Sequence, residues 1–310
     1  MADKTVETSM TVGWIGIGNM GWPMARNARK AGVDIVVYDV DQGRMGKFAE
    51  EFDARRAPTL KALAEMSDVI VTIVPDGKVV RQICFGEGDH LAGAFRPGAI
   101  LIDMSSSAPT GTRALGDELQ KLGVTLIDAP VSGGTLGAEK ATLSIMVGGS
   151  DEAAIAKVMP VLQATGKNIF RCGTLGCGHA MKCLNNYLSA VGLTAANEAL
   201  VIGQKFGLDP GTMIDIINVS SGRNNSTETK YHQRVLNRKY GSGFSAALMT
   251  KDVGIAAGLA GDQEAFAPLL HTLNDIWTQA SAQLPGVDHE VTIEYYEKAN
   301  ATRLKPASKS

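Results

Sequence analysis

The sequence has few cysteines and no long apolar run, and each shortage argues against a class of protein. Only 4 cysteines occur in 310 residues, too few for a small extracellular scaffold held by disulfides. We expect no secretory leader ahead of them. A membrane helix needs about 18 consecutive apolar residues, and the apolar runs of this sequence, such as residues 99–102 before Asp103, are far shorter. We therefore expect a cytoplasmic protein with reduced thiols and no membrane span.

An excess of charge is also missing. The 30 Lys and Arg residues nearly balance the 32 Asp and Glu residues, for a formal net charge of -2. Nucleic-acid binders usually carry a clustered basic excess, so we expect no nucleic-acid partner. Cys172, Cys177 and Cys183 lie near His179, but they lack the paired Cys-x-x-Cys spacing of a structural zinc site. The other histidines show no metal-ligand spacing either, and we expect no metal.

What is present is a composition typical of soluble globular proteins, with 45% hydrophobic and 20% charged residues. A chain of this length usually forms two hydrophobic cores. Up to about residue 170, short apolar runs alternate with helical stretches such as 59–66 and 110–122, which predicts a parallel sheet. We expect strands within 11–17, 35–38, 69–74, 100–102, 124–127 and 143–147, a helix at 151–164 capped by Asp151, and a last strand at 169–170.

Beyond Gly178 the pattern becomes helical. Residues 180–206 keep helical periodicity without a proline, and no later stretch is typical of a strand. The sequence thus predicts an α/β Rossmann domain with a doubly wound, mostly parallel sheet at 1–175, followed by an all-α domain at 176–310. The long helix is too apolar to be covered on one side only, so we expect it at the centre of the second domain. Further helices are expected at 209–220, 248–260, 268–283 and 289–298.

A glycine-rich loop follows the first predicted strand and opens a helix. Its sequence fits the dinucleotide fingerprint G-x-G-x-x-G, and it lies within a βαβ unit of the expected length. The first glycine permits the tight turn, the second leaves room for a pyrophosphate, and the third lets helix and strand pack closely. We expect this loop to bind a dinucleotide through Gly16, Gly18, Asn19, Met20 and Gly21.

Asp39 ends the second strand of that unit, about 20 residues after the glycines, as the fingerprint requires. Its carboxylate would accept hydrogen bonds from the adenosine ribose and repel a 2′-phosphate. This favours NAD as the cofactor. Arg44 is close enough in sequence to reduce that repulsion, so NADP stays possible. A strand-end turn residue is the plainer interpretation of Asp39.

Four segments of the sequence carry motifs that occur together in one enzyme family. They are the glycine loop as far as Asn27, residues 128–134 (Asp-Ala-Pro-Val-Ser-Gly-Gly), residues 173–186 with the pattern G-x-x-G-x-G-x-x-x-K-x-x-x-N, and Lys251-Asp252 with Gly254. Together they resemble the β-hydroxyacid dehydrogenase family, which includes 3-hydroxyisobutyrate dehydrogenases. Residues 128–134 are similar to its substrate-binding motif and residues 173–186 to its catalytic motif. The resemblance implies an NAD-dependent enzyme, a homodimer or homotetramer, that interconverts a small β- or γ-hydroxyacid and its semialdehyde.

The resemblance also implies roles for individual residues. Lys182 would handle the hydroxyl proton, and Asn186, one turn later on the same helix face, would hold a substrate oxygen. The residues themselves leave open whether the lysine is a base with a lowered pKa or a cation that stabilises an alkoxide. Ser132, Gly133 and Gly134 would bind a substrate carboxylate. The cofactor would also be bordered by Val74, Pro75, Ser105, Ser106 and Lys251.

Residues 220–230, rich in Asn and Thr, differ from the usual 3-hydroxyisobutyrate enzyme and leave the substrate open. Arg223 and Asn225 could recognise a second acidic group such as a carboxylate or sulfonate, and Phe244 could form an apolar wall of the substrate site. One alternative is an imine reductase of the same architecture, against which Lys182 argues. Another is a non-catalytic NAD-binding module, because a fold does not fix a function.

Overall fold

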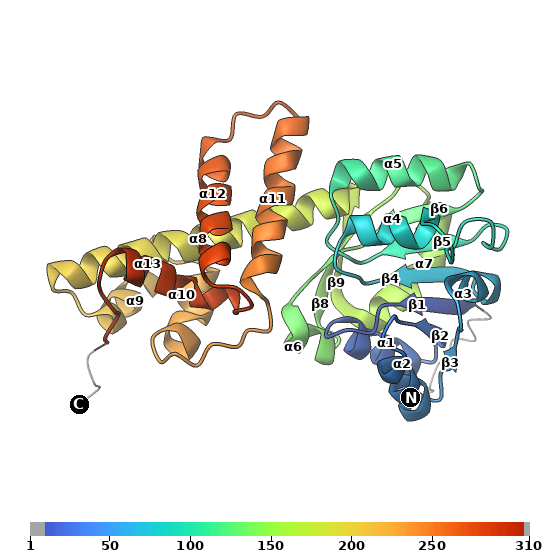
Figure 1. Cartoon of the computed structure of the whole chain (residues 1–310), viewed down its shortest axis with the longest axis horizontal. Coiled ribbons are helices and arrows are strands. Elements are labelled where there is room, and N and C mark those ends of the chain that lie inside the picture. The colour runs from blue at the N-terminus through green and yellow to red at the C-terminus, as the bar shows by residue number, and fades with distance from the viewer. Residues whose placement is uncertain (1–9, 307–310) are drawn as a thin grey trace. The chain divides into compact units, whose positions relative to one another are not determined.

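The structure is a computed structural model that describes residues 10–306. Residue contacts divide the chain after Lys182 into two compact units, and each is described by itself (Figure 1). This division lies inside the long helix α8 (Cys177–Phe206), whereas the predicted boundary after residue 175 lies just before that helix. We propose residues 1–175 and 176–310 as the two functional domains.

Among residues 10–182, a sheet of nine strands forms the framework of the first unit. Its order is β3-β2-β1-β4-β5-β6-β8-β7, with β9 paired to β8. The pairs from β3 to β6 and the β8–β9 pair are parallel, whereas β8 is antiparallel to β6 and β7. The strands are β1 (Thr11–Ile15), β2 (Asp34–Tyr38), β3 (Arg55–Arg56), β4 (Val69–Thr72), β5 (Ile100–Asp103), β6 (Thr125–Asp128), β7 (Val131–Ser132), β8 (Leu143–Gly148) and β9 (Gly166–Gly173).

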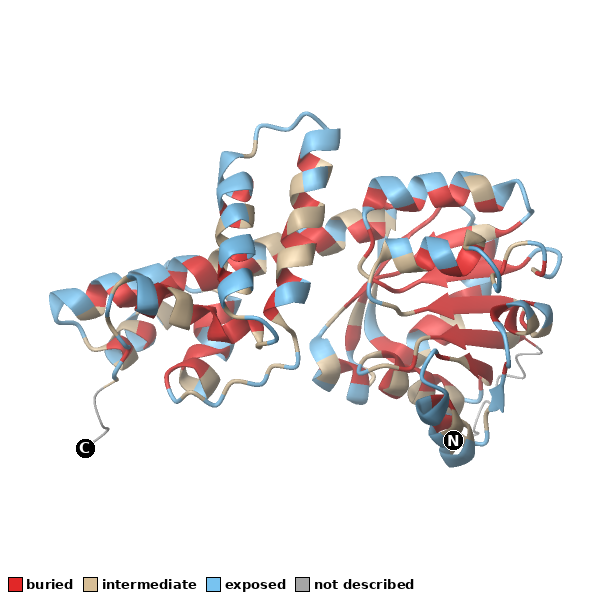
Figure 2. Ribbon diagram, in the orientation of Figure 1, coloured by how far each residue is buried: buried red, intermediate tan, exposed pale blue. Residues whose placement is uncertain are grey.

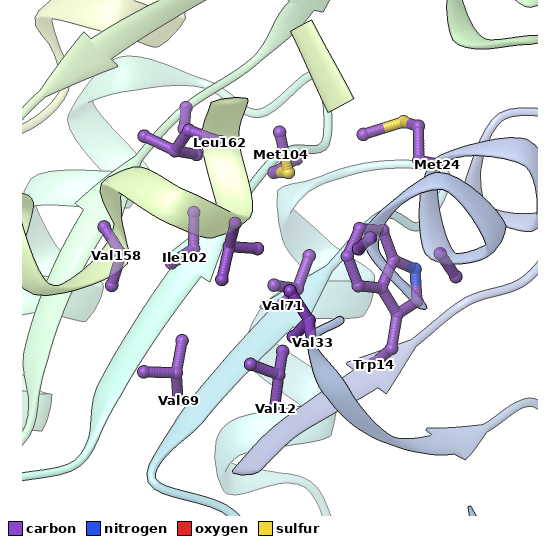
Figure 3. Packing of buried hydrophobic residues seen from close by; sticks show 14 of the residues in the cluster. Val12, Trp14, Met24, Val33, Val69, Val71, Ile102, Met104, Val158 and Leu162 are labelled. Carbon is purple, nitrogen blue, oxygen red and sulfur yellow. The ribbon is translucent and has the colours of Figure 1, made fainter. Parts of the chain in front are cut away.

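Helices cover both faces of this sheet because its strands are apolar on both sides. Successive strand residues point to opposite faces, so Val12 and Trp14 pack on one side and Ile15 on the other. Figure 3 shows Trp14 near Met24 of α1 in the first of these layers. One face is covered by α1 (Gly21–Lys30), α2 (Gln42–Phe52), α6 (Gly134–Glu139) and α7 (Glu152–Thr165), the other by α3 (Leu60–Met66), α4 (Gly77–Phe85) and α5 (Pro109–Gln120). The predicted α/β class is confirmed.

The second unit is helical. Its core contains fully buried Trp277 and Tyr231, and Figure 2 shows its helices with buried and exposed faces. Between residues 183 and 306 no strand occurs, only an isolated bridge between Ser245 and Asp288. The predicted all-α class is confirmed. After α8 follow α9 (Pro210–Asn218), α10 (Asn225–Thr229), the π-helix η1 (Tyr231–Val235), α11 (Ala246–Asp262), α12 (Pro268–Gln283), the 3-10 helix η2 (His289–Thr292) and α13 (Ile293–Ala299).

Predicted and observed elements differ mainly at their ends. The helix predicted at 268–283 agrees with α12, but α8 begins three residues before the predicted residue 180 because a distant carboxylate caps it. The helix predicted at 289–298 is divided into η2 and α13. Within residues 10–306, no helix combines the length and apolarity that crossing a membrane requires.

Candidate active site

Backbone packing explains two glycines of the loop between β1 and α1. Gly16 has φ +93°, and a Cβ there would overlap the carbonyl oxygen of Ile73. At Gly21 a Cβ would overlap the carbonyl oxygen of Gly16 itself. Neither position tolerates a side chain unless the loop moves, so these glycines fix the shape of the turn.

Gly18 differs because its surroundings are open. A Cβ at this position would meet only the Arg44 guanidinium, at 3.8 Å. Asn19 is exposed at the loop tip, and Met20, the N-cap residue of α1, makes no side-chain capping hydrogen bond. The first turn of a helix offers backbone N–H groups and partial positive charge to an anion. This loop therefore fits the pyrophosphate of a dinucleotide.

Asp39 is buried at the end of β2 and holds the loop in place. Its Oδ2 accepts a hydrogen bond from Ile17 N at 2.8 Å, and its Oδ1 accepts one from Asp41 N at 2.8 Å. A carboxylate has about four lone-pair sites, so these two bonds leave acceptor capacity for ribose hydroxyls. Arg44 lies 3.8 Å from Asp41 as a loose ion pair. Asp39 thus has a structural role beside the predicted cofactor role.

A hydrogen bond joins two of the predicted cofactor residues at the carboxyl ends of β4 and β5. The Ser105 hydroxyl accepts from Val74 N at 3.0 Å, and Ser105 itself is buried. Buried Asp103 supports this turn: its Oδ1 accepts from Ser105 N at 3.0 Å and its Oδ2 from the Ser107 hydroxyl at 2.7 Å. Pro75 is exposed and Ser106 half-buried on the same two loops.

The predicted carboxylate-binding turn is attached to the helix that follows the glycine loop. Ser132 ends β7, and Gly133 (φ +133°) and Gly134 (φ +62°) are exposed at the start of the short α6. At the other end of α6, the Asn27 amide of α1 donates to Ala138 O at 2.7 Å. The conformation of the turn therefore depends on α1.

Asp128 holds the beginning of the helix that carries Lys182. It is fully buried at the end of β6, and it accepts hydrogen bonds from Gly176 N at 2.8 Å and His179 N at 2.7 Å. A buried anion at a helix N-terminus satisfies orphan donors and complements the helix dipole. Gly178 permits this approach, since a Cβ there would overlap Met146 O and lie 2.8 Å from the Asp128 carboxylate.

Asn186 follows Lys182 by four residues on α8, and a buried carboxylate fixes its amide. Asn186 Nδ2 donates to Asp252 Oδ2 at 2.5 Å, and Lys251 Nζ lies 3.3 Å from Asp252 Oδ1. Burial, and then the Asp252 charge, raises the pKa of the neighbouring Cys183 thiol to about 12. One carboxylate therefore contacts two predicted site residues, while the thiol stays neutral.

The predicted specificity residues lie on the segment between α9 and α10. Arg223 is exposed and lies 3.5 Å from Glu228, and Asn225 is exposed at the start of α10. Asn224 between them caps α10 and packs on α8, because a Cβ at Gly192 would meet its Oδ1 at 3.0 Å. Phe244 packs edge-on against His289, with ring centroids 5.6 Å apart.

Comparison with known proteins identifies the family of the chain. A family model described as the NAD binding domain of 6-phosphogluconate dehydrogenase matches residues 11–173. A second, described as NAD-binding of NADP-dependent 3-hydroxyisobutyrate dehydrogenase, matches residues 176–296. The 3-hydroxyisobutyrate dehydrogenase of Pseudomonas aeruginosa is 36% identical over 287 residues, which cover 89% of this chain and 95% of that protein. The chain belongs to the β-hydroxyacid dehydrogenase family.

Two further relatives support the family assignment. The 2-(hydroxymethyl)glutarate dehydrogenase of Eubacterium barkeri is 38% identical over 264 residues, 85% of this chain and 86% of that protein. A solved structure of Mycobacterium tuberculosis 3-hydroxyisobutyrate dehydrogenase with L-serine has a TM-score of 0.84 and 33% identity, covering 93% of this chain and 99% of that one. This β-hydroxyacid dehydrogenase is thus an oxidoreductase with a dinucleotide cofactor, NAD or NADP.

Several residues with a place in the site have no individual role in the sequence interpretation. Asp103 and Asp128 end consecutive buried strands, a position where side chains of a doubly wound sheet gather near ligands. Their position at the strand ends could have identified both carboxylates as site residues from the sequence. In the sequence interpretation, Asp252 appears only as part of the Lys251-Asp252 motif, and His179 only beside the cysteines of a rejected zinc site. Within residues 10–306, no group of three His, Cys, Asp or Glu side chains could hold a metal ion.

Proposed function

We propose that this β-hydroxyacid dehydrogenase oxidises a small β- or γ-hydroxyacid to its semialdehyde with NAD, and catalyses the reverse reduction. The observation that carries the proposal is the support given to the two motif residues on α8. The first turn of the helix of Lys182 is capped by buried Asp128, and the Asn186 amide is held by buried Asp252. Solvated helix residues would not need such support.

A few residues would carry out the proton transfer and bind the substrate. A bound nicotinamide would supply the hydride acceptor for oxidation and the hydride donor for reduction. During oxidation Lys182 takes the hydroxyl proton as hydride leaves the carbon, and during reduction it returns that proton to the oxygen. The second N–H of the Asn186 amide donates to a substrate oxygen. Ser132, Gly133 and Gly134 bind the substrate carboxylate through a hydroxyl and backbone N–H groups.

The substrate class we favour carries a second acidic group. A relative named 2-(hydroxymethyl)glutarate dehydrogenase is 38% identical to this chain, and its name describes a dicarboxylate. Arg223 is exposed on a segment anchored to α8 through Asn224, and its ion pair with Glu228 spans 3.5 Å. A guanidinium that is loosely paired can form a bidentate contact with a carboxylate or sulfonate.

The test measures NADH absorbance with a panel of 3- and 4-hydroxyacids and semialdehydes, including diacids, with NADP in parallel. Lys182→Ala should abolish turnover, whereas Lys157→Ala, a change at an exposed lysine of α7, should leave it unchanged. Arg223→Ala should raise the KM for diacids only. If Lys182→Ala kept wild-type turnover, the proposed chemistry would be wrong. NADH binding without any turnover would favour a non-catalytic module.

We also propose a cytoplasmic homodimer or homotetramer without a nucleic-acid partner. The near-balance of charge argues against nucleic acid. Support for an oligomer comes from α8, on which Met181, Leu184, Leu188, Ile202 and Phe206 are exposed apolar residues. Their spacing places them along one side of the helix.

A further inference from the structure

His179 is a buried imidazole on the first turn of α8, three residues before Lys182. Its ring is fully enclosed, and both ring nitrogens have partners. Nδ1 lies 2.8 Å from the Thr112 hydroxyl of α5, and Nε2 lies 3.1 Å from the carbonyl oxygen of Ser105. Because a carbonyl can only accept, Nε2 carries a hydrogen and donates it.

The Ser105 contact connects the lysine helix with the loops that border the predicted nicotinamide site. The carbonyl oxygen of Ser105 accepts from His179, while the hydroxyl of the same residue accepts from Val74 N. Ser105 therefore links the loop after β4 to the first turn of α8 through two hydrogen bonds. Carboxylates surround the ring, with Asp103 Oδ2 at 3.6 Å and Asp128 Oδ2 at 3.8 Å.

Two anchors on one residue determine how the helix begins. The backbone N–H of His179 binds Asp128, which fixes the end of the helix along its axis. A cap of this kind leaves the rotation of the helix about its axis less constrained. The ring, held at both nitrogens on another side, fixes that rotation. A residue three positions later lies on nearly the same helix face. The helix rotation that the His179 ring fixes therefore also sets the direction of the Lys182 side chain.

We propose that His179 is a positioning residue that aligns Lys182 with the cofactor loops through its bond to Ser105. This inference rests on the proposed function of Lys182. A ring that only filled space would affect folding but not the chemical step. A positioning ring instead affects kcat, because small errors in the placement of a proton-handling group slow the reaction by up to about 100-fold.

The experiment compares His179→Leu, which fills the space without hydrogen bonds, with His179→Gln, whose amide can donate to Ser105 O. We expect His179→Leu to lower kcat about 10- to 100-fold, with KM values close to wild type and a larger deuterium isotope effect on kcat. His179→Gln should recover most of the rate. His232→Leu, at a partly exposed histidine paired with Asp215, serves as the control and should change neither constant.

Wild-type kcat in folded His179→Leu, a change confined to KM, or equal losses in the Leu and Gln variants would overturn the proposal. If His179→Leu does not fold, Thr112→Val removes the partner of Nδ1, and an unchanged kcat in that variant would equally overturn it. Failure of the proposed function is separate, since wild-type enzyme would then turn over no substrate. In that case the rate of Lys182 acetylation by acetic anhydride, mapped by mass spectrometry, must still differ between His179→Leu and wild type.

Discussion

At the scale of single residues, Asp252 shows how a carboxylate without a direct chemical role can limit activity. It is almost fully buried and accepts from the Asn186 amide at 2.5 Å. Asp252→Ala would leave a buried amide without its acceptor, which costs about 1–3 kcal/mol. We expect kcat/KM to fall by about 5- to 150-fold, with a smaller loss for Asp252→Asn, which keeps an acceptor.

Steady-state kinetics of both variants would measure this effect. Asp275→Asn on α12 makes the same charge change at an exposed position and should behave as wild type. If Asp252→Ala retained wild-type kcat/KM, Asp252 would have no part in holding Asn186.

Lys230 is a buried lysine whose titration should be visible in stability. Burial lowers its pKa from 10.5 to about 8, opposed by the nearby Glu290 carboxylate, and its Nζ lies 3.1 Å from His289 Nε2. As pH rises, the folded state therefore loses this proton before the unfolded state does. Stability from this residue is lowest below pH 8 and increases until about pH 10.5.

Urea unfolding of wild type and Lys230→Met across this pH range isolates the effect, because other titrating groups cancel in the difference. Wild type should gain up to about 3 kcal/mol relative to the variant between pH 8 and 10.5. Lys157→Met, at an exposed lysine, should show a constant difference from wild type. A constant difference for Lys230→Met would mean that the lysine titrates alike in both states.

At the scale of elements, the sequence predicts what local periodicity encodes. The strands β1, β2, β4, β5 and β6 are apolar runs, and Asp151 caps α7 as predicted by accepting from Ala154 N at 2.9 Å. Elements whose stability comes from distant partners were missed. The two-residue strand β3 is stabilised by its pairing with β2. The π-helix η1 is stabilised by the burial of Tyr231 and Val235. The helices α2, α4, α6 and α10 and the strand β7 were also not predicted.

The same distinction between local and distant partners applies to the residues of the site. Motif residues such as Lys182 and Gly18 are visible in the sequence because their spacing is local. The bonds that orient them are not, since Asp128 and His179 are 51 positions apart and Asn186 and Asp252 are 66 apart. Such pairs depend on strand order and helix packing, which periodicity does not contain.

The start of α8 offers a test at this scale. A methyl group on Gly178 would overlap Met146 O and approach the Asp128 carboxylate, so Gly178→Ala must displace the first helical turn. We expect a loss of stability of about 2–4 kcal/mol, together with reduced kcat. The free energy of urea unfolding and kinetics in parallel would measure both.

Gly258→Ala on α11 is the matched control, because a Cβ there meets no atom within 4 Å. It should stabilise the protein by up to about 1 kcal/mol through the higher helix propensity of alanine. Equal effects of the two substitutions would mean that the start of α8 does not need its close contact with Asp128 of β6 and Met146 of β8.

At the scale of the whole molecule, the exposed apolar side of α8 bears on the proposed oligomer. Leu188 is 64% and Ile202 68% exposed, and they stand 14 residues apart, close to four helical turns. A row of exposed apolar side chains on one side of a helix is typical of a subunit interface when, as among residues 10–306, no helix could cross a membrane.

Charged groups on this side should therefore separate the subunits. We expect light scattering to give a multiple of the 32.6 kDa chain mass for wild type and a smaller mass for the double variant Leu188→Glu and Ile202→Glu. Burial of two carboxylates in an apolar interface costs several kcal/mol, and each 1.4 kcal/mol weakens association about tenfold. Leu122→Glu, at an exposed position beyond α5, should leave the mass unchanged. A monomeric wild type, or an unchanged mass of the double variant, would show that this side of α8 does not hold subunits together.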